Sequence, residues 1–263
     1  MKCQVQGRSV AYGTGSGQHV PDAPCVVMLH GAGFDFSVWV MFARYFARHG
    51  FNVIAPDLPA HGRSEGPALT SIEAIADWVA GLLDAHQIDA THLVGHSMGS
   101  LAAMEFAQRY ASRTRSLALL GTSAPMPVGP PLLNAAADDH PAAFAMANTW
   151  SHSYRARVGA GANPGVNQFV SGQRWLQRMP PGVYHADLAA CNAYQADPVA
   201  LSVPGLVVAG SADKMTGPAA GAAVANKLGA KYLVLEGSGH AMLTEQPNQL
   251  LDALADHMPA ADE

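Results

Sequence analysis

The feature that most constrains the fold is a regular alternation of short apolar runs with longer amphipathic stretches. The apolar runs are PCVVMLHG (24–31), FNVIAP (51–56), ATHLVG (90–95), RSLALLGTS (115–123), VPGLVVAG (203–210) and AKYLVLEG (230–237). Helical patterns occupy 37–50, 70–88, 97–111, 219–229 and 246–258. Because parallel strands need long crossover connections, this order predicts an α/β fold with a mostly parallel sheet covered on both faces. The segments 2–7 and 8–13 add an N-terminal hairpin.

The stretch 70–88 carries its own start signal. Thr70 and Glu73 match the T-x-x-E capping box, in which each side chain bonds the other residue's backbone N–H. The apolar residues that follow recur at helical spacing and form one face. We therefore expect the helix to begin with Thr70 as its N-cap.

One segment breaks the alternation. Residues 122–185 contain several prolines and aromatic residues but no strand-like run, and the segment is too long for a simple connection. We interpret it as a helical cap inserted into an α/β core. The predicted organisation is then a first core part at 1–121, the cap at 122–185 and a second core part at 186–263.

Composition excludes several classes of function. The chain has 263 residues, of which 49% are hydrophobic, which is enough for one large core with an insertion. Its formal net charge is −5 and no basic stripe appears, so no nucleic-acid partner is expected. The apolar runs are too short to span a bilayer, so no membrane association is expected either.

The cysteines and the N-terminus indicate the compartment. Cys3, Cys25 and Cys191 are scattered and odd in number, which favours reduced thiols. The first residues contain no apolar region typical of a signal peptide. We therefore expect a cytoplasmic protein, monomeric or homodimeric, whose partner is a small-molecule substrate. The 12 histidines show no compact ligand spacing, so neither a metal nor another cofactor is predicted.

Polar residues follow four of the predicted strands. His30-Gly31-Ala32-Gly33 follow the first, Gly95-His96-Ser97-Met98-Gly99 the third, Ser211-Ala212-Asp213 the fifth and Ser238-Gly239-His240 the sixth of the apolar runs. In open α/β sheets, ligands bind outside the carboxyl ends of the strands. A serine, a carboxylate, an imidazole and a backbone-rich turn at this edge are the parts of an acyl-transfer site.

Each of these residues has a predicted role in that chemistry. Ser97 is the nucleophile, His240 the base that accepts its proton, and Asp213 the carboxylate that orients His240. Met98, at a helix N-terminus, and Ala32, in the earlier loop, offer backbone N–H groups to the oxyanion. Side chains at the flanking G-x-S-x-G glycines would collide with the adjoining strand and helix.

These motifs resemble those of the α/β-hydrolase fold family over essentially the whole chain. The matching stretches are HGAG (30–33), DLPAHGRS (57–64), GHSMGS (95–100), GSADKMT (210–216) and GSGHAM (237–242). The order Ser97, Asp213, His240 is the family's order. The resemblance implies an eight-stranded, mostly parallel sheet with a cap inserted after the sixth strand.

Three other carboxylates compete with Asp213 for the acid role. Asp57 follows an early strand and is interpreted as a turn carboxylate, whereas Asp187 and Asp197 look like surface or capping groups. Some family members take the acid from the end of the sixth strand, but this chain has no carboxylate there, which favours Asp213.

Four histidines are interpreted without a chemical role. His30 and His96 occupy placements that are structural in similar folds. His152 and His185 fall in or near the cap and are expected at the surface, with contact to the substrate as the alternative. The predicted substrate pocket involves Gly33 and Phe34 beside the oxyanion loop and Trp150 and Trp175 in the cap. An apolar cap underside indicates a substrate with an apolar part.

Three functions fit the sequence. The first is a serine hydrolase that cleaves an ester or lactone of a small, partly apolar molecule through an acyl-enzyme. The second keeps the triad but cleaves a carbon–carbon bond in an aromatic ring-fission product. The third is a lyase or a ligand-binding protein that retains the fold without hydrolysis.

Overall fold

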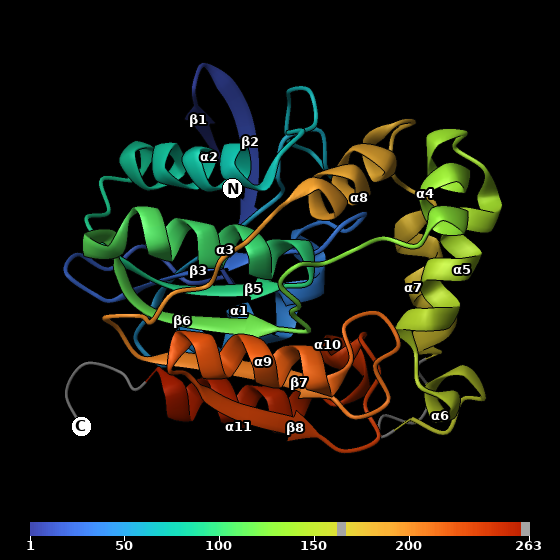
Figure 1. Cartoon of the computed structure of the whole chain (residues 1–263). Coiled ribbons are helices and arrows are strands. Elements are labelled where there is room, and N and C mark those ends of the chain that lie inside the picture. Colours follow the sequence, from blue (N-terminus) through green and yellow to red (C-terminus); the bar gives the residue numbers. More distant parts are fainter. Residues whose placement is uncertain (162–166, 259–263) are drawn as a thin grey trace.

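The computed structural model describes residues 1–161 and 167–258. Its strands form one eight-stranded sheet, which helices surround (Figure 1). The strands are β1 (Lys2–Val5), β2 (Arg8–Gly13), β3 (Cys25–Leu29), β4 (Asn52–Pro56), β5 (Thr91–His96), β6 (Thr114–Leu120), β7 (Gly205–Gly210) and β8 (Lys231–Leu235). Their order is β1-β2-β4-β3-β5-β6-β7-β8. The N-terminal hairpin pairs antiparallel with itself and with β4, and every other pair is parallel. The predicted sheet is therefore confirmed.

Helices cover both faces of this sheet because its central strands are apolar on both sides. The helices of the core are α1 (Val40–Arg48), α2 (Ile72–Ala85), α3 (Met98–Arg109), α9 (Pro218–Leu228), α10 (Met242–Glu245) and α11 (Pro247–His257). Successive strand residues point to opposite faces. Val27 and Leu29 belong to the core cluster on the side of α2, α3 and α9, whereas Val26 and Met28 belong to the cluster on the side of α1, α10 and α11.

The start of α2 differs from the capping-box prediction. Its N-cap is Ser71, whose hydroxyl accepts a hydrogen bond from Ala74 N at 3.1 Å. Thr70 lies one residue outside the helix, so the pairing of Thr70 with Glu73 is wrong. Thr70 and Ser71 can both act as an N-cap. The helix that starts after Ser71 has Ile72 as its first residue, and the side chain of Ile72 is completely buried.

The described elements between β6 and β7 are all helices, and Figure 1 places most of them beyond one end of the sheet. They are α4 (Pro130–Ala137), α5 (Pro141–Ser151), α6 (Tyr154–Arg157), α7 (Gln168–Leu176) and α8 (Val183–Ala193). Tyr184 and Leu188 of α8 pack with the other cap helices, whereas Ala190 and Cys191 pack into the main core. Helix α8 thus crosses the predicted limit at 185 and joins the cap to the core.

No helix in the described part of the chain combines the length and the apolar character needed to span a membrane.

Candidate active site

Ser97 occupies a sharp turn between β5 and α3. Its backbone has φ 54° and ψ −121°, a region that non-glycine residues rarely adopt and that costs on the order of 1–3 kcal/mol. The turn is held in place by a hydrogen bond from Ser97 N to Leu120 O of 2.9 Å, at the end of the neighbouring strand β6. Such strain persists only where the surroundings enforce it. The turn therefore presents Ser97 at the carboxyl end of the sheet.

The two glycines around Ser97 are required by close backbone packing. A Cβ atom at Gly95 would collide with the backbone carbonyl of Gly99, and one at Gly99 would collide with the backbone carbonyl of Leu29. Neither carbonyl can move without disturbing the sheet or the first turn of α3. The steric reason predicted for G-x-S-x-G is confirmed.

Asp213 and His240 form a buried pair at the ends of β7 and β8. His240 Nδ1 donates to Asp213 Oδ2 at 2.8 Å. Asp213 also accepts from Met215 N at 2.7 Å, from Thr216 N at 2.9 Å and from Thr216 Oγ1 at 2.9 Å. Burial alone would raise the pKa of Asp213, but the nearby His240 charge and these hydrogen bonds outweigh burial and lower the pKa below its ordinary value. The site thus favours an ionised Asp213.

The His240 ring lies beside the Ser97 turn. A Cβ atom at Gly121, the residue after Leu120, would lie 2.9 Å from His240 Cε1. On the other side, His96 Nε2 donates to His240 O at 2.9 Å. Among the residues that the structure describes, the ring of His240 has Asp213 and Thr216 as hydrogen-bond neighbours. No hydrogen bond joins the His240 ring to Ser97 within the described part of the chain.

Two backbone N–H groups are available near Ser97. Met98 is the first residue of α3, where N–H groups have no partner within the helix. Ala32 follows β3, and the loop passes so close that a Cβ atom at Gly31 would lie 3.0 Å from Ser97 Cβ. Within residues 1–161 and 167–258, neither the Met98 N–H nor the Ala32 N–H donates a hydrogen bond. These two N–H groups remain the predicted donors to an anionic oxygen.

A pocket of about 390 Å³ opens at Ser97 under the cap. Its lining comprises Ala32, Ser97, Met126, Pro127, Val128, Gly129, Leu132, Trp150, Leu188, Cys191, Lys214, Met215 and Thr216. Most of these side chains are apolar, and Lys214 is the only charged one among them. Trp150 is thus the predicted pocket residue that shares a pocket with the serine.

The other predicted pocket residues lie elsewhere around the turn. Phe34 and Trp175 line a smaller apolar pocket of about 30 Å³ together with His96, and their rings meet edge to face. Trp175 Nε1 also donates to Ser37 Oγ at 3.1 Å, which links α7 to the core. Gly33 lines neither pocket, because Leu176 and Tyr184 of the cap pack directly against its backbone.

The two histidines interpreted as structural are buried and neutral. His30 Nδ1 donates to Gly31 O, and His30 Nε2 accepts from Leu58 N at 3.1 Å. Burial lowers the pKa of His30 to about 3, with a further contribution from His61. Burial, followed by the charge of His240, likewise lowers the pKa of His96 to about 3.

Of the rival carboxylates, two lie as predicted and one does not. Asp57 is a turn carboxylate that accepts from Phe36 N and Arg63 N, each at 2.8 Å. Asp197 is exposed and lies 3.6 Å from Lys227. The prediction that Asp187 is a surface or capping group is wrong. Its carboxylate is buried, because α8 faces the loop after β3 (residues 30–34) and pairs Asp187 with His61 at 2.8 Å.

His152 was also expected at the surface and is instead buried. Its Nδ1 donates to Asn148 O at 2.8 Å, and the residue lines the small pocket beside His96. His185 is half-buried on α8. Sequence reasoning also assigned no role to Thr216 or Lys214. The spacing of Thr216, three residues after the carboxylate, was the available signal, because short hydroxyl side chains bond nearby groups in turns.

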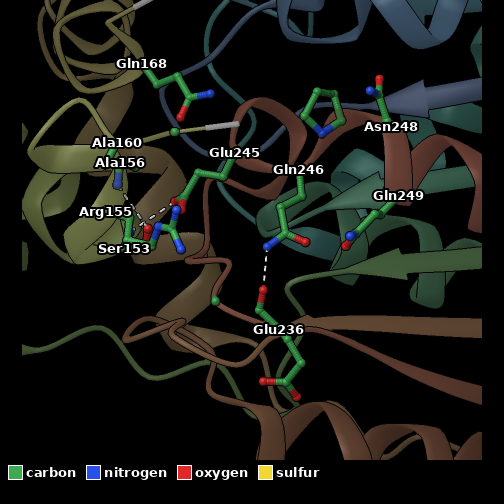
Figure 2. Close-up of a pocket in the computed structure, with 13 residues that line it drawn as sticks. Ser153, Arg155, Ala156, Ala160, Gln168, Glu236, Glu245, Gln246, Asn248 and Gln249 are labelled. Atoms are coloured by element: carbon green, nitrogen blue, oxygen red, sulfur yellow. Dashed lines mark hydrogen bonds between the residues drawn. The ribbon is translucent and has the colours of Figure 1, made fainter. Parts of the chain in front are cut away.

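A third pocket, of about 360 Å³, is lined largely by polar side chains between α6 and α11 (Figure 2). At its edge, Glu245 Oε1 accepts from Ser153 N at 3.1 Å, and Gln246 Nε2 donates to Glu236 O. The neighbouring loop continues this contact, since Ala241 N donates to Ser151 O at 2.8 Å. The bonds of Ser153 and Ser151 fasten the cap to the segment that carries His240.

The fold and these residues define a class of protein, which sequence comparison identifies. Residues 24–247 match the model of the alpha/beta hydrolase fold family, and the chain belongs to this family. The sheet order, the turn at Ser97 and the helices between β6 and β7 agree with that membership.

The relatives include hydrolases of several kinds. A crystal structure of the enol-lactonase from Burkholderia xenovorans LB400 superimposes with a TM-score of 0.84 at 26% identity, covering 98% of this chain and 99% of that one. The chain is 37% identical over 111 residues to a 2-hydroxy-6-oxo-6-phenylhexa-2,4-dienoate hydrolase of Burkholderia cepacia, 39% of each protein. It is 44% identical over 100 residues to a pimeloyl-(acyl-carrier protein) methyl ester esterase of Chromobacterium violaceum, 38% of this chain and 37% of the esterase. The two sequence alignments each cover about two-fifths of the length of the curated relative.

Proposed function

We propose that the chain is a serine hydrolase that cleaves an ester or lactone of a small, partly apolar molecule. The observation that carries this proposal is the strained Ser97 turn, which opens into a pocket of about 390 Å³ beside the buried Asp213–His240 pair. Strained backbone at the mouth of a pocket is typical of functional sites. The family membership supports the same class of chemistry.

The reaction would proceed in two halves. Ser97 Oγ attacks the carbonyl carbon while His240 Nε2 takes the hydroxyl proton, and Nδ1–H remains bonded to Asp213. The N–H groups of Ala32 and Met98 stabilise the negative oxygen of the tetrahedral intermediate. The intermediate expels the alkoxide, which takes the proton from His240. Water, deprotonated by His240, then attacks the acyl-enzyme, and collapse of the second intermediate releases the acid and restores Ser97.

The substrate class follows from the pocket. Its apolar lining suits a compact hydrocarbon portion, and Trp150 provides a flat wall. Lys214 is exposed and adds one positive charge to the rim, which favours a substrate that carries an anionic group. The similarity to an enol-lactonase over 98% of the chain supports a lactone or ester as the scissile group.

A second candidate is hydrolysis of a carbon–carbon bond in a ring-fission product. Its specific support is the 37% identity with the dienoate hydrolase, within an alignment of 111 residues. The dienoate in that relative's name is an anion, which the Lys214 charge would also suit. The two candidates share Ser97 and differ in the bond that is cleaved.

A fluorophosphonate probe separates hydrolases from the third possibility, a lyase or ligand-binding member of the fold. Such a probe phosphonylates an activated serine and leaves others untouched. We expect labelling of wild-type protein at Ser97, followed by turnover of an ester or lactone in a panel that also contains ring-fission dienoates. Labelling with dienoate turnover alone would establish the second candidate. Labelling without turnover would favour the third, and no labelling at all would contradict the nucleophile assignment.

A further inference from the structure

We propose that His61 and Asp187 form a positioning unit. Through their contacts, the position of cap helix α8 fixes the geometry of the loop at residues 31–34, which we call the oxyanion loop. In this account the cap is needed for catalysis as well as for substrate binding, because it fixes one of the two oxyanion donors. The proposal rests on the proposed function, since it assigns Ala32 N–H to the oxyanion.

The Asp187 carboxylate joins three distant parts of the chain. It lies on α8, and its Oδ2 accepts from Gly33 N at 2.9 Å and from His61 Nε2 at 2.8 Å. The side chains of His61 and Asp187 are only 2% and 3% exposed. The same oxygen atom therefore binds the oxyanion loop after β3 and the loop after β4, and it does so away from water.

The hydrogen bonds of His61 define its charge. Its Nδ1 lies 2.9 Å from Pro59 O, and its Nε2 lies 2.8 Å from the Asp187 carboxylate. In the proposed unit Asp187 is a carboxylate, and because a carboxylate and a carbonyl oxygen only accept hydrogen bonds, both His61 ring nitrogens then carry protons. The His61 side chain is therefore an imidazolium in a buried ion pair with Asp187.

The surroundings agree with this charge. Burial alone would lower the pKa of His61, but Asp187, the hydrogen bond to Pro59 and the charge of Asp57 together raise it above its ordinary value. The His30 ring, with its centroid 4.9 Å away, is neutral and adds no opposing charge. Tyr184 and Cys191, which face Asp187 from α8, also stay neutral because burial raises the pKa of both.

The bond to Gly33 acts directly on the predicted oxyanion donor. Phe34 N donates to Gly31 O at 3.3 Å, which makes a tight turn with Ala32 and Gly33 at its centre. Gly33 adopts φ +74°, and cap residues Leu176 and Tyr184 pack against it. Tying the Gly33 N–H to Asp187 fixes the peptide that follows Ala32. The peptide that carries the Ala32 N–H is the next one back, so inside this tight turn its direction is restricted as well. Small errors in such positions cost large factors in rate.

Three variants and one control test this unit. Asp187→Ala removes the acceptor from both Gly33 and His61. Asp187→Asn keeps one oxygen for Gly33 N–H but removes the charge that holds His61 protonated. His61→Gln keeps a donor that does not titrate. Asp197→Asn, an exposed carboxylate beyond the C-terminal end of the same helix, is the matched control.

We expect kcat of Asp187→Ala to fall about 10- to 100-fold with KM changed less than threefold, because losing a whole oxyanion donor costs about 10²–10³. Asp187→Asn should recover part of this loss. The control should match wild type. Phosphonate labelling of Ser97 should slow in the same order, since the phosphonyl oxygen uses the same donors.

The pH profile gives a readout that a merely structural role would not change. Because the pKa of His61 is raised, its proton is lost only above the ordinary histidine value of about 6.5, and kcat should fall at alkaline pH as that proton leaves. The alkaline limb should move to lower pH in Asp187→Asn and disappear in His61→Gln. An unchanged limb in both variants would overturn the proposal.

Two measurements without turnover keep this test separate from the proposed function. In wild-type protein, nitrogen-15 NMR should find both His61 ring nitrogens protonated at neutral pH, and amide exchange of the 31–34 loop should accelerate in Asp187→Ala. If Ser97 is not labelled but these results hold, the hydrolase assignment fails and the linkage stands. A singly protonated His61, or an Asp187→Ala protein that loses stability yet keeps wild-type kcat, would refute the linkage.

Discussion

Replacing Asp213 with asparagine changes the charge of the candidate site with almost no change in shape. The structure dictates how the amide must sit. Asp213 Oδ1 accepts from Met215 N and Thr216 N, two backbone donors that cannot turn away. The amide oxygen must therefore take the Oδ1 position, and the NH₂ group must face His240 Nδ1.

This orientation forces the wrong tautomer on His240. An NH₂ group only donates, so His240 Nδ1 would have to accept and the ring proton would move to Nε2. His240 could then not take the proton of Ser97. The equivalent change in another serine–histidine–aspartate triad costs about 10⁴-fold in kcat. At about 1.36 kcal/mol per factor of ten, this corresponds to roughly 5.5 kcal/mol of lost transition-state stabilisation.

The assay compares kcat, phosphonate labelling at Ser97 and thermal unfolding for Asp213→Asn and Asp57→Asn. Asp57 is the matched control, because it is also buried and also accepts two backbone N–H bonds. We expect Asp57→Asn to lose about 1–3 kcal/mol of stability while kcat changes only a few-fold. A folded Asp57→Asn protein with lower activity than Asp213→Asn would refute the assignment of the acid.

Three further outcomes follow from the same contacts. Gly99→Ala should lower the free energy of unfolding by about 1–3 kcal/mol and slow phosphonate labelling. The reason is that the alanine Cβ would collide with Leu29 O and lie 2.6 Å from His30 O. Wild-type stability of this variant in a urea titration would contradict the prediction. Lys214→Gln should reduce kcat/KM for a carboxylate-bearing ester by up to about fivefold, because an exposed ion pair contributes about 0–1 kcal/mol. The same change should leave kcat/KM for a neutral ester unaffected. Equal effects on both esters would exclude a contact between Lys214 and the substrate charge. Folding lowers the pKa of Asp213, so the ionised carboxylate stabilises the folded protein above the ordinary carboxyl pKa of about 3.9. This contribution is lost as the pH falls through the lower pKa of the folded state. In thermal melts at different pH values, the difference in stability between wild type and Asp213→Asn should therefore narrow only below about pH 4.

The sheet and the strand-end residues could be predicted because their signals are local. Continuous apolar runs, helical periodicity and glycine spacing act over a few residues, and the parallel topology then brings the ends of β3, β5, β7 and β8 together. Ser97, Asp213 and His240 are predicted as a triad in this way, and the structure brings Asp213 and His240 within 2.8 Å of each other. The helix start at Ser71 was missed by one residue because Thr70 offers an equally good local cap.

The cap contacts could not be predicted because they join residues far apart in sequence. Asp187 and His61 are separated by 126 positions, and nothing local distinguishes a buried carboxylate on α8 from a surface one. His152 was misread for the same reason, since its burial comes from the packing of α5 and α7 against the core. Pairing a histidine with a carboxylate across the cap required the three-dimensional arrangement.

The most direct test of Ser97 as the nucleophile is peptide mapping by mass spectrometry after reaction with a fluorophosphonate. We expect one phosphonyl group on Ser97 of the wild-type protein and none at position 97 of Ser97→Ala, with turnover lower by several orders of magnitude in that variant. A wild-type protein that stays unlabelled at Ser97, or a Ser97→Ala protein that keeps near-normal turnover, would contradict the acyl-enzyme mechanism.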